Sequence, residues 1–149
     1  MLRTVIVAMM AAALAHASGF TFTLGSPVAA QDYRAKTAAF VFRTQGCDDP
    51  AKAQISATAE GVLKGARRSA ALKVMPMQAS GVYAVYQSWP GEGAWVVNLR
   101  GTCGDANAGA IVPIGPKGFI RESAKFFSRP ATDTEIETSL KALTQEGNR

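Results

Sequence analysis

The stretch that decides the fold is VYAVYQSWPGEGAWVVNLR, residues 82–100. A run rich in β-branched and aromatic residues leads into the turn-forming sequence PGEG, and a second such run follows it. Two runs of this kind around a Pro/Gly turn are typical of a β-hairpin. Because side chains alternate along a strand, Trp95, Val97 and Leu99 share one face, which we expect to lie in the core.

Other short runs with strand character surround this stretch. Residues 54–60 alternate cleanly between apolar and polar side chains, which indicates a half-buried strand. Further candidates, punctuated by glycine or proline, are residues 37–43, 68–75, 110–114 and 119–127, with Pro113 expected to place its strand at an edge or bulge. About seven short strands in roughly 100 residues predict an immunoglobulin-like antiparallel β-sandwich, and a small β-barrel is the alternative.

The chain ends in a predicted α-helix that begins at Thr132. The sequence from Thr132 to Glu135 fits a capping box, in which the two side chains each bond the other residue's backbone N–H. Ile136, Leu140 and Leu143 recur at helical spacing and form an apolar stripe. We expect residues 132–149 to form a helix and tail that pack on or beside the sandwich.

The first 30 residues have the layout of a secretory signal peptide. Arg3 supplies the positive start, and the run from Val5 to Ala17 is almost wholly apolar. The predicted organisation is a signal peptide at residues 1–30, a β-sandwich domain at 31–131 and the C-terminal segment at 132–149. The mature protein is then expected in the periplasm or secreted, and an uncleaved membrane anchor is the alternative.

Two cleavage points follow small residues in this leader. The first is Ala15-His16-Ala17, just before Ser18, and the second is Val28-Ala29-Ala30, just before Gln31. We expect the second to be used, because Pro27 ends any helix just upstream of it.

The chain has two cysteines, Cys47 and Cys103. In an oxidising compartment two cysteines in a small domain most simply form one structural disulfide, and two unpaired thiols are the alternative. A bridge would bring together the loops that carry Asp48, Asp49 and Asp105, whose oxygens suit Ca²⁺. Ordinary turn chemistry explains these acids equally well, so no metal site is assigned to them.

The residue inventory excludes several kinds of catalysis. His16 is the only histidine and lies in the predicted leader, so a mature chain has no Ser-His-Asp triad and no histidine metal site. The Met75-Pro76-Met77 sequence offers two thioethers, which we expect to fill a core gap at a strand end, and Cu(I) binding is the alternative. The formal net charge is +5, with scattered basic residues that indicate a solvated surface rather than nucleic-acid binding. No enzyme activity and no cofactor are expected.

The runs Gly81–Val85 and Trp89–Val97 resemble the corresponding part of bacterial YtkA-like and FixH-like domains. In these small extracytoplasmic immunoglobulin-like sandwiches, a Gly-x-Tyr strand leads through a Pro-Gly corner into a Gly-x-Trp strand. The resemblance covers Gly81 to Arg100 only. It implies the sandwich fold and an envelope location, and it assigns no catalytic residue.

These observations favour a secreted or periplasmic binding or accessory module without catalytic activity. Its partner is expected to be another envelope or extracellular protein or a polymer, with membrane contact only if the leader stays attached. Tyr86, Trp89 and Glu92 are the candidate contact residues, since Tyr and Trp anchor many interfaces. The alternative for Trp89 is that its ring folds over the end of the sandwich and seals it. Two other candidate functions are a secreted inhibitor of a hydrolase and a Ca²⁺- or copper-binding protein.

Overall fold

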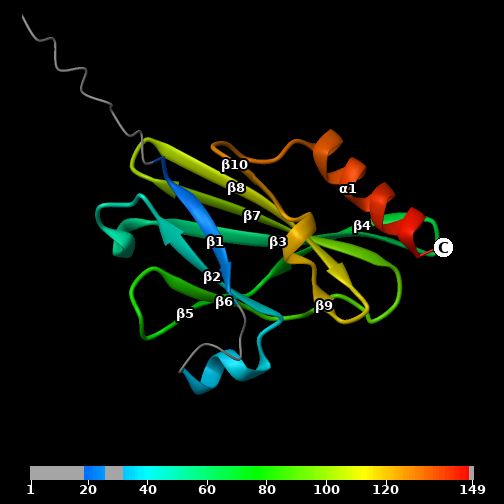
Figure 1. Ribbon diagram of the computed structural model, residues 1–149, viewed down its shortest axis with the longest axis horizontal. Coiled ribbons are helices and arrows are strands. Elements are labelled where there is room, and N and C mark those ends of the chain that lie inside the picture. The colour runs from blue at the N-terminus through cyan, green and yellow to red at the C-terminus, as the bar shows by residue number, and fades with distance from the viewer. Residues whose placement is uncertain (1–18, 26–31, 148–149) are drawn as a thin grey trace, which may run out of the picture.

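The described part of the chain forms a sandwich of two antiparallel β-sheets with one α-helix on its outside (Figure 1). The computed structural model describes residues 19–25 and 32–147. One sheet has the order β1 (Thr21–Gly25), β2 (Phe40–Gln45), β6 (Val82–Val85) and β5 (Val74–Pro76). The other has the order β10 (Lys125–Phe127), β8 (Ala106–Gly115), β7 (Ala94–Cys103), β3 (Gln54–Leu63) and β4 (Ala66–Leu72), and β9 (Gly118–Phe119) pairs with β8.

The predicted mainly β fold with a C-terminal helix is therefore confirmed. The sheets form two separate layers in the part of the chain that the structure describes, so the barrel alternative is wrong. The described residues form ten strands rather than about seven, because the predicted runs 68–75 and 119–127 each divide between two strands and β1 lies outside the predicted runs. Short 3-10 helices also link strands in the described ranges, namely η2 (Tyr33–Thr37), η3 (Pro50–Lys52) and η4 (Arg121–Ser123).

The main core lies between the two sheets. Phe40 and Phe42 of β2 face Val97 and Leu99 of β7, and all four side chains are almost fully buried. Trp95 is buried in the same cluster, so the face predicted from its alternation with Val97 and Leu99 is confirmed. The spacing of apolar residues along β7 is what places this strand at the centre of the molecule.

The predicted hairpin of residues 82–100 is wrong. β6 pairs with β2 and β5, whereas β7 pairs with β3 and β8 in the opposite sheet. The two strands are separated by residues 86–93, a longer connection than the two to five residues of most hairpins. β7 also extends over ten residues, whereas β6 has four. Pairing with the long strands β3 and β8 therefore allows β7 to form many more backbone hydrogen bonds than pairing with β6 would. The Pro-Gly corner therefore crosses from one sheet to the other.

β8 shows what Pro113 does in a strand. It lies inside its sheet rather than at an edge, with β7 on one side and both β9 and β10 on the other. The Pro113 carbonyl accepts a hydrogen bond from the Ile120 N–H at 2.8 Å. β9 and β10 both pair with β8 on this side, and η4 lies between them in sequence. The missing N–H of Pro113 therefore falls where the hydrogen-bond ladder is already interrupted.

The C-terminal helix is confirmed as α1 (Asp133–Glu146). Thr132 and Glu135 form the predicted capping box. Ile136 and Leu140 are buried against Val96 and Ile111, so α1 covers the outer face of β7 and β8 (Figure 1). The middle of these two strands is thereby buried on the outer face as well as on the inner one.

A strand lies inside the segment that was predicted to be a signal peptide. Residues Thr21 to Gly25 form β1, which pairs with β2 from Thr21↔Gln45 to Gly25↔Val41. The sandwich therefore includes residues 19–25 and does not begin at residue 31 as expected. The remaining parts of the predicted leader, residues 1–18 and 26–31, lie outside the described residues.

The two sheets are joined covalently. Cys47, just after β2, forms a disulfide with Cys103 at the end of β7, with the two Cα atoms 5.9 Å apart. The structural disulfide expected from the sequence is thus present, and disulfides persist in oxidising compartments. Among the described residues, no helix is long and apolar enough to cross a membrane.

Candidate functional site

A cleft of about 570 Å³ opens at the end of the sandwich opposite the disulfide. Its walls come mainly from three segments that are distant in sequence, namely residues 87–95 before and at the start of β7, residues 114–120 around the β8–β9 turn, and residues 143–147 at the end of α1, and Ala39 also lines it. Its larger apolar side chains are those of Trp89, Trp95, Ile114, Phe119, Ile120 and Leu143. This volume falls within the range of about 300–1,000 Å³ that is usual for small-molecule sites.

Trp95 is held in the cleft wall by both its ring and its indole N–H. The N–H donates to the Glu92 carbonyl at 2.8 Å. The ring lies on Gly61 of β3, where an added Cβ would clash with it. Gly93 has φ = +90°, a conformation that other residues rarely adopt, and it completes the turn that brings the Glu92 carbonyl to the indole.

Trp89 comes from the connection just before this turn. It is only 6% exposed and belongs to the main core cluster, and the Gln87 side-chain amide donates to its carbonyl at 3.1 Å. The structure thus agrees with the alternative in which the Trp89 ring seals the end of the sandwich. Trp89 also lines the cleft.

The other two predicted contact residues lie elsewhere. Glu92 is exposed beside the cleft and contributes its carbonyl to Trp95. Tyr86 is half-buried in a separate small cluster with Ala35, Met77 and Ala84. Tyr86, Trp89 and Glu92 therefore do not form one exposed contact surface.

The cleft has little charge. Among the described residues that line it, Glu146 is the one ionisable side chain. Much of the remaining wall is backbone, because glycine, alanine and proline contribute many of the lining positions. Such a wall offers peptide N–H and C=O groups and apolar surface, so it can hold a neutral ligand by burial and a few hydrogen bonds.

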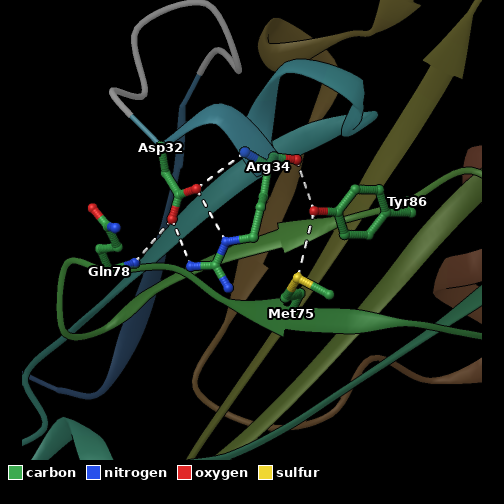
Figure 2. Close-up of polar contacts among 5 residues, drawn as sticks. All are labelled: Asp32, Arg34, Met75, Gln78 and Tyr86. Atoms are coloured by element: carbon green, nitrogen blue, oxygen red, sulfur yellow. Dashed lines mark hydrogen bonds and ion pairs between the residues drawn. The ribbon is translucent and has the colours of Figure 1, made fainter.

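A well-connected polar cluster lies away from the cleft, between η2 and the β5–β6 loop (Figure 2). The Arg34 guanidinium donates to both Asp32 carboxylate oxygens, from Nε at 3.1 Å and from Nη2 at 2.7 Å. The backbone N–H groups of Arg34 and Gln78 also donate to Asp32. These bonds, led by that of the Arg34 side chain, hold the pKa of Asp32 well below its usual range.

Tyr86 extends this cluster on the other side of η2. Its hydroxyl donates to the Arg34 carbonyl at 2.8 Å and lies 3.7 Å from the Met75 sulfur (Figure 2). Because the Asp32 carboxylate and the Tyr86 hydroxyl bond the Arg34 side chain and nearby backbone groups, we interpret the cluster as a clamp that fixes η2 on the sheet. Met75 and Met77 both pack in the small cluster next to it, as expected for residues that fill a core gap.

The acids near the disulfide are used in turns. Asp49 accepts from the Ala51 N–H at 3.2 Å as the cap of η3, and its carboxylate lies 4.0 Å from the Lys52 ammonium. Within residues 19–25 and 32–147, no three His, Cys, Asp or Glu side chains come together in a way that could hold a metal ion. Asp48, Asp49 and Asp105 therefore do not form a cluster of that kind.

The cleft was not predicted from the sequence, although residues in two of its walls were singled out for other reasons. Trp89 and the PGEG turn stood out as a corner, and Leu143 as part of the helical stripe. The sequence alone does not indicate that residues 114–120 lie next to these two segments, because their position depends on the pairing of β8 with β7 and on where α1 packs. No protein family, curated protein or solved structure matches this chain, so the resemblance to YtkA-like and FixH-like domains stays a prediction.

Proposed function

We propose that this chain is an exported, non-catalytic binding module that takes a neutral, largely apolar small molecule into the cleft. The observation that carries the proposal is the cleft itself, with its volume of about 570 Å³, its aromatic and aliphatic walls and its single carboxylate among the described lining residues. Sites of this size and composition usually bind ligands by burying their apolar surface.

Export is supported by two independent features. The Cys47–Cys103 disulfide joins the two sheets, and disulfides of this kind are rare in proteins that stay in a reducing cytosol. The N-terminal sequence has a positive charge, an apolar run and small residues before a cleavage point. The periplasm or the extracellular space fits both.

A binding role suits the chain better than catalysis because its perturbed ionisable groups are fully occupied. The described acids with lowered pKa are Asp32 and Glu135, whose carboxylates bond Arg34 and Arg129 respectively. Neither pair lines the cleft. A general acid or base has to reach the bound substrate, and the described cleft residues offer only Glu146 for that purpose.

The cleft can be probed with the uncharged dye N-phenyl-1-naphthylamine, which fluoresces in apolar surroundings. The chain has two tryptophans, and both line the cleft. Dye bound there should therefore be excited by energy transfer from tryptophan, and this sensitised emission should saturate with one dye per protein.

Gly91 provides a variant that fills the cleft. It is exposed, it lines the cleft, and an added Cβ would meet no atom within 4 Å. We expect Gly91→Phe to weaken dye binding by about tenfold or more, which is a loss of about 1.4 kcal/mol, with an unchanged melting temperature. The matched control is Ala71→Phe on the exposed strand β4, which should bind like the parent.

Equal dye affinity in Gly91→Phe and the parent would refute the cleft as the binding site. Absence of tryptophan-sensitised emission at saturating dye would do so as well. An intermediate result in which both phenylalanine variants weaken binding equally would point to a nonspecific surface effect and count against the proposal.

A further inference from the structure

β1 is an integral part of the hydrophobic core. Phe20, just before it, and Phe22 are each 3% exposed, and Leu24 is 7% exposed. The Phe22 ring contacts the Phe42 ring of β2 edge to face, with centroids 5.4 Å apart. β1 also contacts β8 and β10 of the opposite sheet, so it closes one side of the sandwich.

The rest of the chain is shaped to accept these two phenylalanines. Gly101 lies within β7, where glycine weakens a strand and often marks the close approach of another group. A Cβ at Gly101 would lie 2.7 Å from the Phe22 Cζ atom and 3.0 Å from the Phe20 Cε1 atom. The Ile55 Cδ1 atom of β3 would also lie 3.0 Å away, so Phe20 and Phe22 supply two of the three close neighbours that the glycine accommodates. Without β1, the bare backbone at Gly101 and one face of the Phe42 ring would be exposed to water.

This bears on which of the two cleavage points removes the leader. Cleavage after Ala30 would discard β1, whereas cleavage after Ala17 would keep it. The segment before Ser18 has every part of a signal peptide on its own, with Arg3, an apolar run from Val5 to Leu14 and the pattern Ala15-x-Ala17.

We propose that the leader is removed between Ala17 and Ser18, so that the mature chain keeps β1; this rests on the export proposed above. A leader peptidase, a hydrolase of the exporting cell, adds water across the Ala17–Ser18 peptide bond. The reaction leaves a carboxylate on Ala17 and a new α-amino group on Ser18. Residues 19–25, which lie between the two candidate cleavage points, then belong to the folded protein and not to the signal.

The experiment uses the full chain, produced in a bacterial host with a working export pathway. The protein is recovered from the periplasm and the medium, and its intact mass and N-terminal sequence are determined. We expect a chain that begins at Ser18. A mature chain that begins at Gln31, or at any residue after Phe20, would overturn the proposal and leave export standing. A chain that keeps Met1 and stays in the cytoplasm would overturn both this proposal and the proposed export.

Two matched variants test the position of the cut. Ala17→Phe places a large side chain directly before the proposed bond, and we expect the yield of processed protein to fall about tenfold or more. Ala30→Phe makes the same change before the other candidate bond, and we expect processing to be unchanged. The reverse result, in which Ala30→Phe blocks processing and Ala17→Phe does not, would show that β1 is removed and the proposal is wrong.

Discussion

Replacing Phe22 with alanine should measure how much β1 stabilises the mature protein. Truncation of a buried phenylalanine to alanine costs about 3–5 kcal/mol. Phe22 is 3% exposed, but it lies in an edge strand of five residues that can shift to fill part of the gap. We therefore expect a loss of about 3 kcal/mol, at the lower end of this range.

The assay is urea unfolding of the exported, processed protein, followed by tryptophan emission. With a slope of about 2 kcal/mol per molar urea, the midpoint should fall by about 1.5 M. Phe126→Ala makes the same chemical change at a side chain that is 44% exposed, and its effect should stay below about 1 kcal/mol. If Phe22→Ala prevents folding, Phe22→Leu should show a smaller shift in the same direction. Equal midpoints for Phe22→Ala, Phe126→Ala and the parent would refute the reasoning.

Three further perturbations test other parts of the structure. Reduction of the Cys47–Cys103 disulfide, which closes a loop with a sequence separation of 56, should lower the free energy of unfolding by about 4 kcal/mol in the chain-entropy model; urea unfolding with and without a thiol reductant would show this, and identical curves would contradict it. The Arg129 guanidinium lowers the pKa of Glu135 from 4.5 to about 2, so the stability that this pair provides is present above pH 4.5 and is lost as the pH falls toward 2. Glu135→Gln should flatten the pH dependence of the melting temperature in that window, and an unchanged slope would show that the pair contributes nothing. Tyr86→Phe removes the hydrogen bond to the η2 carbonyl and should cost about 1 kcal/mol in urea unfolding, whereas no loss would mean that water replaces the bond.

The parts of the fold that could be predicted depend on neighbours in the sequence. The capping box of Thr132 and Glu135 is a contact between residues three apart, and the alternation within β3 is a property of one strand. Local spacing is enough to identify such elements, because the periods of helix and strand fix which side chains share a face. The disulfide could be predicted because the chain has only one possible cysteine pair.

The errors came from choices between long-range partners. The sequence of a Pro-Gly corner between two strands is the same whether the two strands pair with each other or belong to different sheets. The pattern of residues 82–100 therefore predicts a hairpin that the structure does not contain. β1 was overlooked because its apolar residues continue the apolar run of the leader. Its alternation of Phe20, Thr21, Phe22, Thr23 and Leu24 is nevertheless the period-two signal of a strand, and it distinguishes this segment from the continuous run before Ala15.

The cleft and the Asp32 clamp show a different limit. Each joins segments that are far apart in the chain, and each uses backbone groups, such as the Gln78 N–H that donates to Asp32. Backbone groups have no sequence signature, since every residue except proline carries the same N–H and C=O. A site lined largely by glycine, alanine and backbone is therefore the kind that a single sequence conceals.

β7 separates the covalent bridge of the sandwich from its candidate binding site. Trp95, near the first end of the strand, lines the cleft, and Cys103, at the other end, carries the disulfide. At about 3.3 Å per residue the two positions lie roughly 26 Å apart, well beyond the range of about 7–10 Å within which substitutions usually couple. The bridge can therefore fix the spacing of the sheets at one end without constraining the other. At the end with the cleft, the walls are held by the packing of two tryptophans and by the last turn of α1. A ligand bound in the cleft would therefore add contacts between segments that no disulfide joins.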